Sequence, residues 1–117
     1  MGTGRYTAAS VDALLGAAAA DPAGFRLLFH HAAREPEFRE DVDRLRAAMV
    51  TVTQRELARA IPDGRWATWA AYLVPVVAIE AVTAWLDAGQ PDPAAAADRI
   101  RDAVHGIIQA AQPRQPP

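Results

Sequence analysis

Cysteine and lysine are absent from this chain of 117 residues, and serine occurs once, at Ser10. Without cysteine the chain has no disulfide bond, no thiol nucleophile and no thiolate metal ligand. All 12 basic residues are arginine, and 14 acidic residues outnumber them, which leaves a net charge of −2. Direct, non-specific binding to nucleic acid requires a basic face, so we expect this chain alone to bind no nucleic acid.

Catalytic and metal-binding patterns are also lacking. The single serine lies near the N-terminus, and we find neither a glycine-rich phosphate loop nor a paired-carboxylate motif. His30 and His31 are adjacent and would point about 100° apart on a helix, while His105 is isolated in the sequence. We therefore expect no catalytic residues, no metal site and no cofactor, and we expect that the protein is not an enzyme.

Alanine is abundant, with 28 residues, and hydrophobic residues make up 51% of the chain. A chain of this length forms one domain, and its core would consist largely of small side chains. No segment alternates apolar and polar residues as a strand does. The N-terminus lacks the basic-then-apolar pattern of a signal peptide, so we expect a cytoplasmic protein.

Capping and breaking residues delimit five helices. Asp21 and Asp92 each precede a proline. An Asp-Pro sequence favours a helix start because the aspartate side chain accepts hydrogen bonds from free backbone N–H groups, and proline fits the first helical position. Glu35-Pro36 breaks a helix, and Gly89 ends one. The expected fold is an all-α bundle of about five helices, at residues 11–20, 22–34, 37–60, 66–88 and 94–111. We expect a flexible tail at 1–9, a domain at 10–111 and a disordered tail at 112–117.

The most apolar stretch runs from residue 66 to 86 and contains one charged residue, Glu80. A helix that is apolar on every side must be buried in a core, at an interface or in lipid. The stretch is long enough to span a bilayer, but Glu80, Pro75 and the high alanine content argue against a membrane span. The Glu80 carboxylate could anchor a ligand or dimer contact, or reach solvent at a helix edge.

Aromatic residues cluster in two regions, which suggests a ligand pocket between the helices at 22–34, 37–60 and the first half of 66–88. Pro75 should kink the last of these helices and splay its Trp69 end away from its neighbours, which would open space. The ligand would be hydrophobic or aromatic, with Tyr72 as a hydrogen-bond donor; ordinary core packing is the alternative. The predicted pocket residues are Phe25, Phe29, Met49, Trp69 and Tyr72.

Two apolar stripes predict a homodimer. One stripe of small residues follows the helix at 66–88, where another helix could approach closely, and the other follows the helix at 94–111. The predicted interface residues are Val77, Ala81, Ala84, Trp85, Ile100, Val104, Ile107 and Ile108.

Two segments resemble one family. DPAGFRLLFHHAAREPEFREDVDRLR, residues 21–46, resembles the region that follows the DNA-binding domain of tetracycline-repressor-type (TetR) regulators. VVAIEAVTAWLDAGQPDPAAAADRI, residues 76–100, resembles the final two helices of those proteins. The resemblance in order and length covers about residues 10–111. Ala81, where relatives often carry glycine, and Pro75 depart from the pattern.

The resemblance implies an effector-binding domain whose last two helices pair with their copies as a four-helix dimer bundle. The family's helix-turn-helix is missing before Ser10, so we expect either a truncated regulator or a free-standing sensor-like domain. The effector would be a small molecule, and no residue identifies it. A structural dimerisation module without ligand and a small helical enzyme remain the alternatives.

Overall fold

The computed structural model describes residues 2–31 and 34–114, which form helices with no strand among them. The elements, in chain order, are α1 (Gly2–Ala20), α2 (Pro22–Arg26), the π-helical turn η1 (Leu27–His31), α3 (Pro36–Ala60), α4 (Gly64–Asp87) and α5 (Pro93–Ala110). The expected all-α bundle of about five helices is confirmed.

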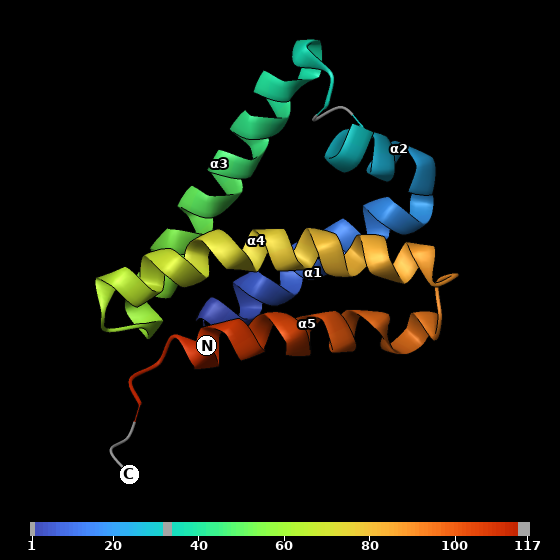
Figure 1. Ribbon diagram of the computed structural model, residues 1–117. Helices are drawn as coiled ribbons and strands as arrows, with labels where there is room; N and C mark the ends of the chain where they lie inside the picture. Colours follow the sequence, from blue (N-terminus) through green and yellow to red (C-terminus); the bar gives the residue numbers. More distant parts are fainter. Residues whose placement is uncertain (1, 32–33, 115–117) are drawn as a thin grey trace.

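Helix α4 is the central element, and α1, α3 and α5 all pack against it. In Figure 1, α5 runs beside α4 in the opposite direction, α1 lies behind these two helices, and α3 rises away from the turn that joins it to α4. Ala18, Ala70 and Ala71 are completely buried. Their small side chains allow neighbouring helix backbones to approach closely, which gives the alanine-rich composition a structural role.

Short-range hydrogen bonds set the helix ends. The Asp21 carboxylate accepts the N–H of Gly24 at 3.0 Å and caps α2. At the end of α4, Gly89 adopts a φ of 89°, a left-handed conformation that glycine enters without steric cost. The N–H of Gln90 then donates to the carbonyl of Trp85 at 2.9 Å, which completes a Schellman motif and stops the helix.

The chain ends differ from the predicted tails. Helix α1 begins at Gly2, so residues 2–9 are helical and the predicted helix start at residue 11 is wrong. Residues 5–10 contain neither glycine nor proline, so the helix extends through them. At the other end, the Gln112 amide donates to the carbonyl of Ala60 at 3.0 Å, which holds this residue against the bundle. Met1 and residues 32–33 and 115–117, parts of the predicted tails and of the predicted helix 22–34, lie outside the described residues.

Helix α4 is, within the part of the chain described, the one helix long and apolar enough to cross a membrane by length and composition alone. Half of its most apolar window is buried inside the protein. The helix continues through Pro75, and Ala67 and Ala70 on the N-terminal side stay buried. The predicted splaying of the Trp69 end is therefore wrong, because packing holds both halves of α4 against the core.

Candidate functional site

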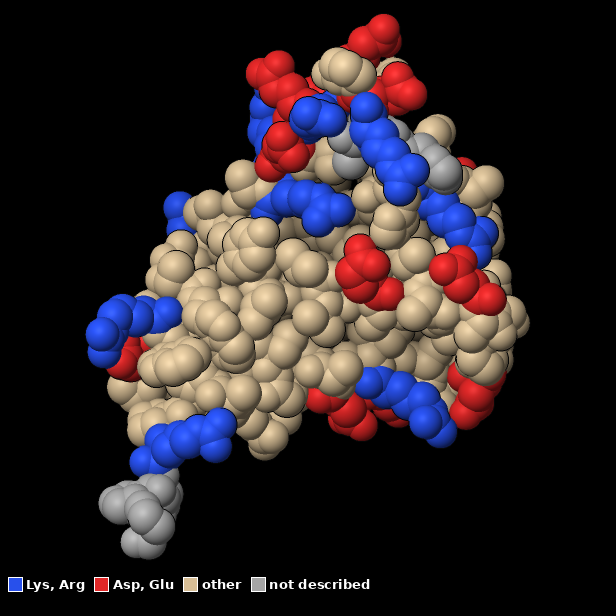
Figure 2. All heavy atoms as spheres, viewed as in Figure 1, with Lys and Arg blue, Asp and Glu red and all other residues tan. Residues whose placement is uncertain are grey.

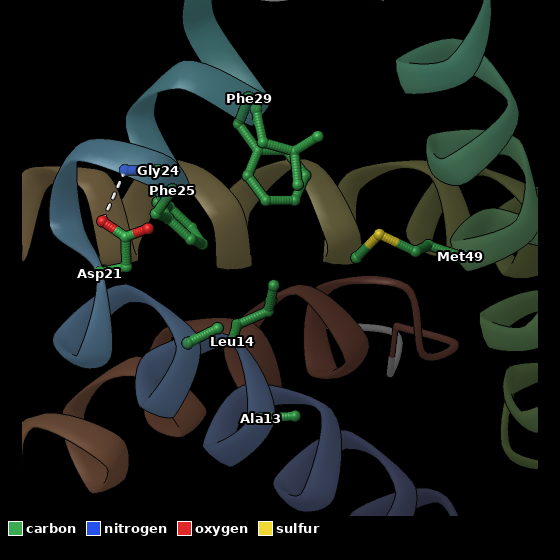
Figure 3. Close-up of a pocket in the computed structure, with 9 residues that line it drawn as sticks. Ala13, Leu14, Asp21, Gly24, Phe25, Phe29 and Met49 are labelled. Atoms are coloured by element: carbon green, nitrogen blue, oxygen red, sulfur yellow. Dashed lines mark hydrogen bonds between the residues drawn. The ribbon is translucent and has the colours of Figure 1, made fainter.

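An open cavity of about 610 Å³ lies between α1, the α2–η1 segment and α3. This volume falls within the range of about 300–1,000 Å³ that is typical of small-molecule sites. Figure 3 shows Phe29, Leu14 and Met49 extending toward the same space from three different elements. The lining residues are Ala13, Leu14, Ala17, Asp21, Gly24, Phe25, Leu28, Phe29 and Met49.

Phe25 and Phe29 form the aromatic wall of the cavity. Their ring centroids lie 4.9 Å apart and the ring planes are inclined by 50°, a tilted arrangement that aromatic pairs favour. Both side chains are almost fully buried, whereas Leu28 lies exposed beside them. The cavity therefore has a firmly packed aromatic wall and an apolar side chain that is accessible to solvent.

The π-helical turn that carries Phe29 is held by two contacts. The Arg46 guanidinium of α3 donates to the Phe29 carbonyl at 3.3 Å. His30 Nε2 lies 3.0 Å from the Thr83 hydroxyl of α4, and that hydroxyl donates its one proton to the carbonyl of Ile79 at 2.9 Å. His30 must therefore carry a proton on Nε2 and donate it to Thr83. π-helical turns are rare and are frequent at functional sites, and this one links the cavity wall to α3 and α4.

Among the side chains that the structure describes, Asp21 is the one titratable group that lines the cavity. General acid–base chemistry on a bound substrate usually needs a second positioned group, and these described side chains supply none. Among the described residues, no three His, Asp or Glu side chains come together where they could hold a metal ion. The cavity is thus equipped for binding through apolar contacts and one carboxylate.

The cavity brings together three of the predicted pocket residues, Phe25, Phe29 and Met49. Trp69 and Tyr72 do not line it: they are 38% and 63% exposed on α4. The placement of these two residues in the pocket, and of Tyr72 as its donor, is therefore wrong. In the first half of α4, Ala67, Ala70 and Ala71 face the core, while Trp66, Trp69 and Tyr72 point outward. The Trp69 ring packs edge-on against the Trp66 ring, with 5.2 Å between the ring centroids.

Helix α1 supplies the wall that the sequence analysis assigned to α4. Ala13, Leu14 and Ala17 lie within about one helical turn of each other on α1 and line the cavity. Their spacing is an apolar i, i+1, i+4 pattern, which could have identified this face of the helix. The missing information was which neighbouring element α1 would meet.

The predicted dimer interface divides into two groups. Ile100, Val104 and Ile108 are buried in the chain's own core, so their side chains are covered without a partner chain. Their contact with a second copy stays a prediction. Their apolar stripe already finds its partner in the helices of the same bundle, where α5 packs on α1 and α4. The predicted residues that keep solvent-accessible surface are Val77, Ala81, Ala84, Trp85 and Ile107.

Glu80 lies exposed on α4, so its carboxylate reaches solvent, as expected of a residue at a helix edge. Trp85 is half-buried, and its indole N–H donates to the Pro91 carbonyl at 2.8 Å, which ties α4 to the turn before α5. The cavity beside η1 is consequently the candidate ligand site, and the outer face of α4 is a separate apolar surface.

Compared with protein-family models, with curated proteins and with solved structures, the chain matches none.

Proposed function

We propose that this chain is the effector-sensing and dimerisation domain of a TetR-type transcriptional regulator and that it binds a small apolar or aromatic ligand. The observation that carries the ligand part is the cavity of about 610 Å³ with an aromatic wall. The resemblance of residues 21–46 and 76–100 to that family supports the regulatory part. The ligand enters from the open side of the cavity and packs against Phe25, Phe29 and Met49.

The contacts around η1 connect the proposed ligand site to α3 and α4. A ligand that pushes on Phe29 also moves His30, since the two residues are neighbours in the π-helical turn. His30 donates to Thr83, so a displacement of η1 changes the packing on α4. A sensor requires this kind of differential contact between liganded and free states.

The ligand site can be tested by filling the cavity. Ala17 lines it from α1, so Ala17→Phe places a large ring where the ligand would lie. Ala19 is exposed on α1 about 200° away around the helix and does not line the cavity, so Ala19→Phe is the matched control. The probe is N-phenyl-1-naphthylamine, a neutral aromatic compound whose fluorescence rises in an apolar site.

We expect saturable binding to the wild type and to Ala19→Phe, and affinity at least about tenfold weaker for Ala17→Phe. Tenfold is about 1.4 kcal/mol, or the apolar contact of nearly two methylene groups. Trp69→Ala should bind as the wild type does, because Trp69 lies outside the cavity. Equal binding by Ala17→Phe and the wild type would contradict the site. The absence of binding to the wild type would leave the alternative function, a structural dimerisation module without ligand.

The outer face of α4 supports the dimerisation part. Trp66, Trp69, Tyr72 and Ala84 are exposed on it, and Glu80 is the one charged residue between positions 66 and 86. Figure 2 shows a broad area without arginine or acidic side chains, viewed from the side on which α4 lies in front in Figure 1. Contiguous apolar surface of this kind marks interaction sites, and a second copy of the chain is the partner we propose.

Ala84→Arg would place a long charged side chain in this contact. Sedimentation at micromolar concentration should show a dimer for the wild type and a monomer for Ala84→Arg. A stable dimer buries about 1,600 Å² or more in close contact. An arginine side chain at the centre of that contact would hold the two surfaces apart. A monomeric wild type, or an Ala84→Arg variant that still dimerises, would contradict this interface.

A further inference from the structure

We infer that the cavity selects organic cations: the flat apolar body of the ligand lies against Phe25 and Phe29, and its positive group lies at Asp21. This inference rests on the proposed ligand-binding function and adds the charge class of the ligand. Three observations support it: the charge balance of the cavity, the fit around Asp21, and the aromatic wall.

The negative charge of Asp21 has no cationic partner among the described residues. Its Oδ1 accepts the N–H of Gly24 at 3.0 Å, which uses one lone pair and leaves the charge in place. Arg26, five residues further on, pairs instead with Asp87 at 2.8 Å. Arg46, which reaches η1, donates to the Phe29 carbonyl. Arg26 and Arg46 are thus engaged elsewhere, and the exposed Asp21 carboxylate can pair with the positive group of a ligand.

Gly24 keeps the Asp21 carboxylate at the cavity. A Cβ atom at position 24 would lie 2.2 Å from Asp21 Oδ2, so any other residue would push the carboxylate aside. Figure 3 shows this carboxylate at the edge of the cavity, below Gly24 and next to Phe25. Gly24 therefore leaves room for the Asp21 carboxylate at the edge of the cavity and holds it there with one hydrogen bond.

The aromatic wall favours the same ligand class. Phe25 and Phe29 line the cavity. An aromatic ring attracts a cation that lies over its face, in addition to making apolar contact with a flat molecule. A neutral ligand gains only the apolar contact, and an anion is repelled by Asp21. We therefore expect affinity to fall in the order cation, neutral molecule, anion for ligands of one shape.

Three probes of nearly equal shape test this order: 1-naphthylmethylammonium, 1-naphthalenemethanol and 1-naphthoate. Their affinities are measured by calorimetry for the wild type and for Asp21→Asn. Asparagine caps helices as well as aspartate does, so this variant removes the charge and keeps the start of α2. Glu80→Gln removes the same charge from the outer face of α4 and is the matched control.

The wild type and Glu80→Gln should prefer the cation over the alcohol by about fivefold, near the upper limit for an exposed ion pair. Asp21→Asn should bring this ratio close to one, and raising the salt concentration from about 0.01 M to 1 M should lower it in the wild type. Equal affinities for cation and alcohol in the wild type, or an unchanged preference in Asp21→Asn, would overturn the charge selection and leave apolar ligand binding standing. Failure of all three probes to bind the wild type would overturn both proposals.

Discussion

Replacing Thr83 with valine tests the link between the cavity wall and the central helix. Thr83 is 9% exposed, and its hydroxyl joins His30 of η1 to the Ile79 carbonyl of α4. Valine has the same branched shape and nearly the same helix propensity, so the change removes little besides the hydroxyl. The Ile79 carbonyl keeps its helical backbone bond, and the His30 N–H is the group that loses its partner.

The expected cost follows from the exposure of His30. A hydrogen bond of this kind contributes about 0.5–1.5 kcal/mol to stability. Because His30 is only half-buried, its ring can partly reach water, so we expect a loss of about 1 kcal/mol in the free energy of unfolding. For a domain of this size, that loss lowers the melting temperature by about 4 °C.

Urea unfolding followed by circular dichroism measures the stability change, and ¹⁵N NMR of the histidine ring reports its tautomer. Thr51→Val is the matched control, because Thr51 makes the same bond to the carbonyl four residues back, at Ala47, but lies exposed. We expect its effect to stay within about 0.5 kcal/mol. Equal stability of Thr83→Val and wild type, with a wild-type His30 that carries its proton on Nδ1, would refute the proposed link.

Two further predictions concern the α3–α4 region. Hydrogen bonds from the Arg65 side chain and backbone N–H lower the pKa of Asp63 from its ordinary value of 3.8, so this carboxylate favours the folded state at neutral pH and loses that effect as the pH falls through the lowered pKa. NMR titration should give a pKa below 3.8 for Asp63 and a higher one in Arg65→Ala; identical values would contradict the hydrogen bonds. Leu57 is 1% exposed, so Leu57→Ala should cost about 2–5 kcal/mol in urea unfolding. Leu45→Ala, on the exposed side of the same helix, should cost much less, and similar losses would contradict the assigned core.

The helix boundaries were predictable because local chemistry determines them. Asp21, Pro36 and Gly89 act on the backbone within a few residues of themselves, and the helices begin or end beside them as expected. The start of α1 was missed because Gly2 and Gly4 suggested a tail, whereas an alanine-containing segment without interior proline can remain helical.

The orientation of α4 could not be predicted from its sequence. A helix that is apolar on all sides offers no polar face to mark the outside, so Trp69 and Tyr72 were placed inward and lie outward. The packing of the apolar stripe on α5 was ambiguous in the same way. From the sequence alone, Val104 is equally suited to the core of its own chain and to contact with a second chain. Only the tertiary arrangement, which puts α1 against α5, decides between them.

The ion pair between Arg101 and Asp12 also has a consequence for the order of folding. These residues are 89 positions apart, so their contact closes a loop of most of the chain, whereas a short turn joins α4 to α5. The entropy lost on loop closure grows with loop length, so the α4–α5 hairpin can form early and α1 docks late. Since α1 supplies one wall of the cavity, the cavity is completed only when the two distant parts of the chain have met.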